Sequence, residues 1–155
     1  IPVFLSYVLG FVSAGIYWNN HHHMLATVKR VNGSILWANM HLLFWLSLIP
    51  FATAWLGENH FSKWPTALSG FALLAAAIAY FILQSVIVRT QGADSLLRRA
   101  VGSDLKGKAS PILYASAIGL AFVAPILSNL IYVLVALVWL VPDKRIERIL
   151  SEVEK

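Results

Sequence analysis

Hydrophobic residues are gathered into long runs that short polar segments separate. A helix that crosses the hydrocarbon core of a bilayer needs about 20 mostly apolar residues, and the runs at 3–24, 36–56 and 66–88 meet this requirement. A fourth run, 111–141, is too long for one crossing. Its Ala124-Pro125 interruption favours two short spans, at about 110–124 and 126–141, over a single span with an appendix. We therefore predict an all-α fold, a polytopic transmembrane helix bundle with five spans within residues 1–142.

The positions of Lys and Arg favour the same division. If the last run crosses twice, eleven of the twelve basic residues lie on one side, and only Lys63 lies on the other. Positively charged loops stay cytoplasmic. We expect a multi-pass membrane protein, with its C-terminus in the cytoplasm and Ile1 outside. One further helix upstream would explain an external start without a translocation signal, and would give six spans in the intact subunit.

Composition supports a membrane protein over a soluble one. The chain is 59% hydrophobic and 12% charged, whereas soluble domains carry about 25% charged residues. The absence of cysteine excludes disulfides and cysteine-based metal sites. A net charge of +5 is ordinary for the loops of a membrane protein, so it gives no reason to expect a nucleic-acid partner.

Two segments outside the predicted spans are amphipathic. Residues 93–104 predict a short interfacial helix, with Leu96, Leu97, Ala100 and Val101 on one side. The tail at 143–155 is expected to be cytoplasmic, and it places four apolar residues at helical spacing. It is either a surface helix that continues the last span or an assembly contact.

Polar residues within the spans carry no formal charge. Ser6, Gly10, Ser13, Tyr17 and His21 share one helical face, which is either a packing seam or a hydrated surface near an ion path. No predicted span has Asp, Glu, Lys or Arg in its interior. Ion-coupled pumps usually carry such a group, so a passive pathway or a structural assembly remains.

The stretch YWNNHHHML (17–25) places three histidines at the end of the first span. Consecutive helical residues are about 100° apart, so His21, His22 and His23 fan over about 200° and cannot all face one metal. They are interfacial side chains in an aromatic belt, members of an interhelical hydrogen-bond network, or part of a metal or haem site. The last alternative would make the chain a membrane redox protein that uses His21, His22 and His41.

The stretch YWNNHHHML is followed by ILWANMHLLFWLSLIPFATAWLG at 35–57. Taken in this order, the two stretches resemble the second and third helices of the transmembrane protein 175 family of potassium channels. The family pattern is a Trp followed shortly by Asn-His-His, then a helix with Trp-x-Asn near its start and Pro-Phe-x-Thr near its end. The matching residues are Trp18, Asn20, His21, His22, Trp37, Asn39, Pro50, Phe51 and Thr53. Residues 135–145, VALVWLVPDKR, also resemble the last helix of the family.

The resemblance implies a subunit that conducts potassium passively, not an enzyme, with no cofactor besides the permeant ion. Four identical subunits would surround a central pore in the lipid bilayer. The first helix of the family carries an Arg-x-x-x-Phe-Ser-Asp signature and lines the pore. Since no such stretch occurs in these 155 residues, we expect this sequence to begin at the second helix. As given, it could also be a non-conducting membrane assembly module.

The resemblance also assigns roles to the matching residues. Six of them would form a network that braces the pore helix: Trp18, Asn20, His21, His22, Trp37 and Asn39. Three would serve as a helix kink and packing contact: Pro50, Phe51 and Thr53.

Overall fold

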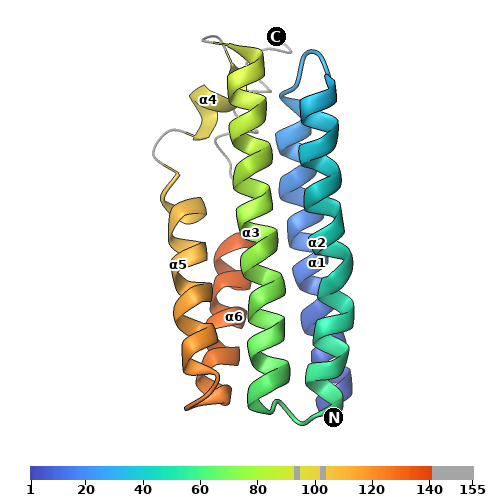
Figure 1. Ribbon diagram of the computed structural model, residues 1–155, viewed down its shortest axis with the longest axis vertical. Helices are drawn as coiled ribbons and strands as arrows, with labels where there is room; N and C mark the ends of the chain where they lie inside the picture. The colour runs from blue at the N-terminus through green and yellow to red at the C-terminus, as the bar shows by residue number, and fades with distance from the viewer. Residues whose placement is uncertain (93–94, 102–103, 141–155) are drawn as a thin grey trace.

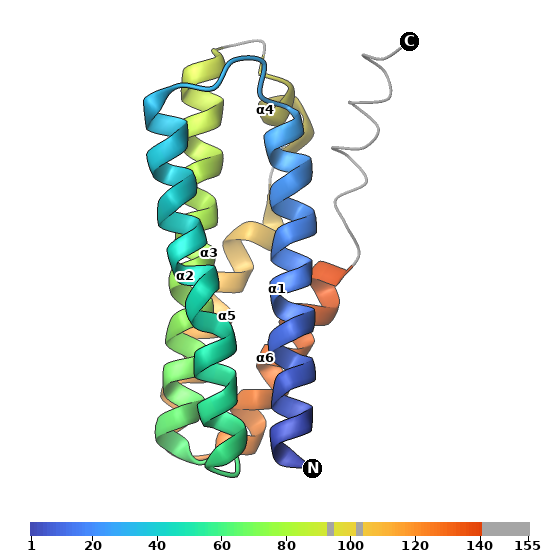
Figure 2. The same cartoon turned by 90° about the vertical axis from the view of Figure 1, so that its right-hand side faces the viewer.

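The computed structural model describes residues 1–92, 95–101 and 104–140, and within them the chain forms a bundle of α-helices (Figure 1). Three long helices run side by side, and two shorter ones cover part of their length (Figure 2). A sixth, very short helix lies near the end of α3. The bounds are α1 Pro2–Ala26, α2 Gly33–Glu58, α3 Lys63–Gln91, α4 Leu96–Val101, α5 Leu105–Leu120 and α6 Pro125–Leu140.

Each predicted span overlaps one helix over most of its length, although the helices start and end at other residues. The largest difference is at α5, which begins at Leu105 rather than near 110. The side chain of Asp104 accepts a hydrogen bond from the backbone N–H of Gly107 at 3.1 Å, so it caps the helix before the apolar run begins. Between α5 and α6 the chain turns near Pro125, since α5 ends at Leu120 and Pro125 opens α6.

Small residues bring α1 and α2 close together. A Cβ added at Gly57 would lie 2.9 Å from the Cα of Val3, and one added at Gly10 would collide with the hydroxyl of Thr53. Ser6, Gly10, Ser13 and His21 are buried. The small-polar face of the first helix is therefore a packing seam, since backbones can approach closely only where side chains are small.

The α5–α6 hairpin is fixed to α3 by hydrogen bonds and by one close contact. The hydroxyl of Tyr132 donates to the carbonyl of Thr66 at 3.1 Å. Gly70 faces the same ring, because a Cβ there would lie 2.7 Å from Cζ of Tyr132. Within the hairpin, Ser128 donates to the carbonyl of Ala117 at 2.7 Å. Tyr132 thus anchors the hairpin on α3 without any charged group.

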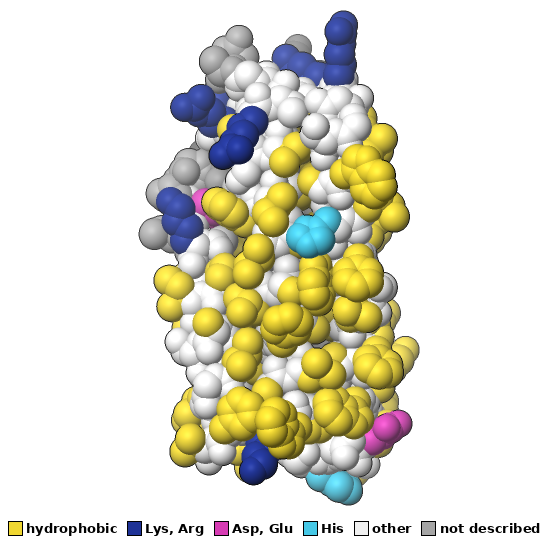
Figure 3. All heavy atoms as spheres, viewed as in Figure 1, with side chains coloured by type: hydrophobic (Ala, Val, Ile, Leu, Met, Phe, Trp, Pro, Cys, Tyr) yellow, Lys and Arg dark blue, Asp and Glu magenta, His cyan; other side chains and the backbone are white. Residues whose placement is uncertain are grey.

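The outer surface shows the character of a membrane protein. Hydrophobic side chains predominate over its middle in Figure 3, while Lys and Arg side chains gather at the end that carries α4. One basic side chain lies at the opposite end in that view. By length and hydropathy, two of the described helices, α2 and α3, can each cross a membrane, and α6 is a shorter apolar helix. The number of five spans stays a prediction.

The amphipathic segment predicted at 93–104 lies partly outside the described residues. Within its described part, Leu96–Val101 is helical as α4. Leu97 and Ala100 are buried in a core cluster with Met24 and Leu83. Arg98 and Arg99 are exposed. Residues 143–155, where an amphipathic tail was predicted, lie outside the described residues.

Candidate functional site

A short hydrogen bond joins α1 to α2 at the histidine-rich stretch. Nε2 of His21 lies 2.6 Å from Oδ1 of Asn39. Because an amide oxygen can only accept, Nε2 carries the proton and donates. His21 is buried and Asn39 is half-buried, so the bond is partly shielded from solvent. We call this pair the clasp; it joins two of the residues that the sequence singled out.

Asn20, next to the clasp, ties α1 to two other helices. Its Nδ2 donates to the carbonyl of Ile16 at 2.8 Å and lies 3.4 Å from the carbonyl of Trp139 in α6. The hydroxyl of Tyr80, in α3, donates to the backbone carbonyl of Asn20 at 3.3 Å. Residues 20 and 21 therefore bring α1, α2, α3 and α6 together at one level of the bundle.

A small cavity adjoins Asn20. It measures about 40 Å³ and is lined by α1, α3, α5 and α6, which is room for a few water molecules. Aromatic rings form part of its wall. The ring of Tyr80 packs edge-on against those of Tyr17 and Trp139, with centroids 6.4 and 6.0 Å apart. The indole N–H of Trp139 donates to Oγ of Ser110 at 2.7 Å.

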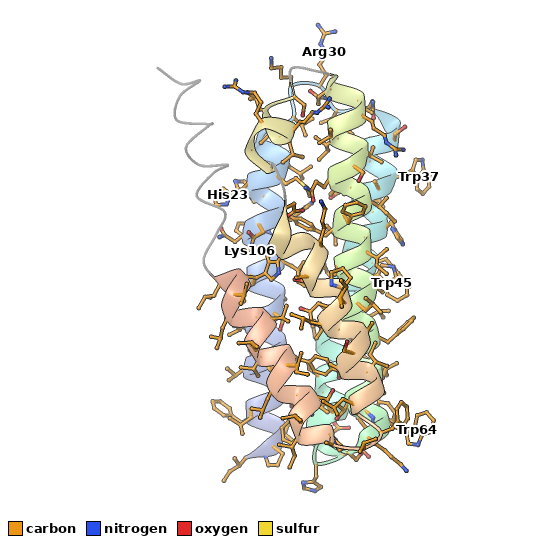
Figure 4. The ribbon with its side chains drawn as sticks, turned by 90° about the vertical axis from the view of Figure 1, so that its left-hand side faces the viewer. His23, Arg30, Trp37, Trp45, Trp64 and Lys106 are labelled. Atoms are coloured by element: carbon orange, nitrogen blue, oxygen red, sulfur yellow. The ribbon has the colours of Figure 1, made fainter. Side chains whose placement is uncertain are left out.

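The remaining aromatic members of the predicted network face outward. The rings of Trp18 and His22 stack at 5.5 Å with an angle of 13° between their planes, as expected for residues one turn apart. Trp18 is 64% exposed and Trp37 is 79% exposed. Figure 4 shows Trp37 and Trp64 projecting from the bundle on the side of α2 and α3, whereas Trp45 is half-buried and packs against the hydrophobic core. These rings do not join the clasp within this chain.

The residues of the Pro-Phe-x-Thr motif also differ in burial. Thr53 is 3% exposed and faces Gly10 of α1. Its hydroxyl donates to the carbonyls of Ile49 and Pro50 at 3.0 and 3.1 Å. Pro50 lies inside α2 without ending it, and Phe51 is 69% exposed. Thr53 is thus a packing contact, while the other two face outward.

The histidines do not converge. His41 follows Asn39 by two residues and so projects about 200° further around α2; its Nε2 accepts a hydrogen bond from Nε1 of Trp45 at 3.0 Å. It is exposed, whereas His21 points into the clasp. In the part of the chain that the structure describes, no three His, Cys, Asp or Glu side chains form a group that could hold a metal ion.

Comparison with known proteins identifies the family. The family model described as "Endosomal/lysosomal potassium channel TMEM175" matches residues 1–50, which include the clasp. A potassium channel of Chryseobacterium sp. (strain P1-3) is 53% identical over 152 residues, covering 98% of this chain and 79% of that protein. This chain belongs to the TMEM175 family of potassium channels.

More distant relatives agree with this membership. A potassium channel of Streptomyces collinus is 28% identical over 88% of this chain and 69% of its own length. One of Chamaesiphon minutus is 33% identical over 37% of this chain and 28% of its own length. No solved structure matches. As a TMEM175-family protein the chain is a membrane protein of an ion-channel family.

Three residues of the site were not predicted from the sequence as parts of the network. In the sequence, Tyr80 and Gln84 are polar residues within the apolar run 66–88, and Trp139 belongs to the stretch 135–145 that resembles the last helix of the family. Each bonds to a group far away in the sequence: Tyr80 to Asn20, Gln84 to Asp104 and Trp139 to Ser110. A polar side chain within an apolar run indicates that a hydrogen bond is needed, but it does not indicate which group is the partner.

Proposed function

We propose that this chain is a subunit of a potassium-permeable channel that conducts passively through a central pore. The pore would lie on the axis of an oligomer of identical subunits, a homotetramer, in the inner membrane of a prokaryote. The observation that carries the proposal is the 53% identity to a protein named a potassium channel, over 98% of this chain. The absence of charged residues within the apolar stretches of the helices fits passive conduction.

The clasp supports a bracing role for the motif residues. His21 and Asn39 hold α1 and α2 in register, and Asn20 adds α3 and α6. With these helices fixed, the outward rings of Trp18, His22 and Trp37 are left to contact the pore-lining helix or a neighbouring subunit. Large aromatic side chains are well suited to such contacts, since they bury much area with few rotatable bonds.

The distribution of charge supports the orientation. The described Lys and Arg residues, apart from Lys63, lie in α3 near its end, in α4, in the first turns of α5 and in the α1–α2 turn. By the positive-inside rule this end faces the cytoplasm. The C-terminus then lies in the cytoplasm as well, because an α5–α6 hairpin that enters from this side also returns to it.

A flux assay tests the proposal. The full-length product of the native gene is reconstituted into liposomes with a potassium gradient, and potassium and sodium flux are compared with those of protein-free liposomes. We expect downhill potassium flux that needs no coupling ion. No flux above that of the empty liposomes would refute channel function. After chemical cross-linking, species up to the mass of four subunits would support the homotetramer. Species that reach only the mass of two subunits would contradict it.

A further inference from the structure

On the side that we propose faces the cytoplasm, the α5–α6 hairpin ends below the level at which α3 ends. We call this difference in height the step. The α3 helix has 29 residues and is about 43 Å long, which matches a bilayer with its headgroup layers, about 40–45 Å. The α5 and α6 helices have 16 residues each, about 24 Å, which is less than the hydrocarbon core of about 30 Å. Both short helices meet α3 at its N-terminal end, so they stop well before α3 does (Figure 1).

A hydrogen bond fixes the height of this step. Nε2 of Gln84 donates to Oδ2 of Asp104, the residue that caps α5, at 3.2 Å. Gln84 precedes the end of α3 at Gln91 by about 10 Å of helix. The N-terminus of α5 therefore lies about 10 Å below the level at which α3 ends.

The step places an exposed lysine below the usual headgroup level. Lys108 follows Asp104 by about 6 Å of helix and is exposed. Nζ of Lys106, nearby, donates to the carbonyl of Val138 at 3.3 Å (Figure 4). An ammonium group at hydrocarbon depth is costly unless it meets water or an opposite charge. Asp104, the described acidic residue at this step, already accepts hydrogen bonds from Gln84 and Gly107.

Two arginines lie above the same step. In Figures 1 and 2, α4 is placed beyond the start of α5 along the long axis. Burial of Leu97 and Ala100 against the core leaves Arg98 and Arg99 on the exposed side of α4. The step is therefore bordered by Arg98 and Arg99 above it and by Lys108, on the short hairpin, below it.

We propose that an anionic phospholipid of the cytoplasmic leaflet binds at this step, with its headgroup phosphate between Arg98, Arg99 and Lys108. Its acyl chains would lie along the exposed apolar face of α5 and α6, where the hairpin is too short to span a bilayer of normal thickness. A phosphate drawn down into the step neutralises Lys108, and the thinner bilayer matches the hairpin. This inference rests on the proposed orientation, not on conduction.

Lipid retention tests the site. The protein is purified in detergent, and phosphatidylglycerol or phosphatidylcholine is titrated in while bound lipids are counted by native mass spectrometry. We expect retention of phosphatidylglycerol over phosphatidylcholine. Removal of one positive charge should lower the affinity for phosphatidylglycerol about fivefold. No preference of the wild-type protein for the anionic lipid would overturn the site, whatever the variants do.

Matched variants separate a specific site from general surface charge. The R98Q/R99Q variant removes two charges from the step, and K29Q/R30Q removes two from the α1–α2 turn at the same end. Backbone groups of Lys29 and Arg30, not their side chains, bond Gln91, so this control keeps that contact. K108Q is paired with K63Q in the same way. If each step variant and its matched control lose phosphatidylglycerol retention equally, the site is contradicted. Potassium flux is measured separately, so that failure of the lipid site can be distinguished from failure of the channel proposal.

Discussion

Replacing His21 with alanine is expected to loosen α1 from α2 and to change potassium conductance. The substitution removes the 2.6 Å bond to Asn39 and leaves that amide without its partner. Hydrogen bonds between membrane helices are worth about 0.6 kcal/mol on average and up to about 1.7 kcal/mol. Because this bond is short and partly buried, we expect a value at the upper end, near 1.5 kcal/mol. Asn39→Ala should have a similar effect.

A double-mutant cycle isolates the bond. The free energy of unfolding in detergent is measured for His21→Ala, Asn39→Ala and the double variant, together with single-channel conductance. We expect the double variant to lose less than the sum of the single variants, by about 1 kcal/mol. His23→Ala, two residues further along the same helix, serves as the control and should do less. Strict additivity, or equal indifference at all three positions, would refute the clasp.

Replacing Gly70 with alanine is expected to displace the α5–α6 hairpin from α3. The new methyl group would lie 2.7 Å from Cζ of Tyr132 and 2.8 Å from Cγ1 of Ile118. The ring of Tyr132 is completely buried and its hydroxyl is held by Thr66, so it cannot swing aside. Overpacking of this kind costs about 1–3 kcal/mol, and we expect the upper part of that range.

Thermal unfolding in detergent measures this effect. A loss of about 2–3 kcal/mol corresponds to a decrease of about 4–12 °C in Tm for a chain of this size. Gly119→Ala is the matched control, because Gly119 lies on the exposed side of α5 and a Cβ there meets nothing within 4 Å. The control should be neutral or slightly stabilising, since alanine favours the helix. A Gly70→Ala variant as stable as this control would show that the hairpin packs differently.

The helices could be predicted from the sequence because the signal for each is local. Runs of apolar residues, a proline at a turn and the distribution of Lys and Arg each depend on neighbours in the chain. The packing seam of α1 was also visible as a face of small residues, although its partners Thr53 and Gly57 were not. The start of α5 was missed because a cap depends on the side chain of Asp104, not on hydropathy.

The motif residues illustrate the limit of prediction for the site. The family resemblance singled out Asn20, His21, Asn39 and the nearby aromatic residues as one network, whose polar partners were expected on another helix. The structure joins His21 directly to Asn39 and turns Trp18 and Trp37 outward. Which side chains of a helix meet depends on how it is rotated against its neighbours, and that rotation is set by packing along the whole interface.

By itself, the sequence determined that this protein is a helical membrane protein, where its apolar helices lie and which end carries the positive charge. Those properties follow from composition and from patterns a few residues long. Only the tertiary structure decided that His21 pairs with Asn39, that Tyr132 fills the space above Gly70, and that the short α5–α6 hairpin leaves a step below α4. The physical reason is that each contact joins residues far apart in the chain, so it depends on the mutual placement of whole helices.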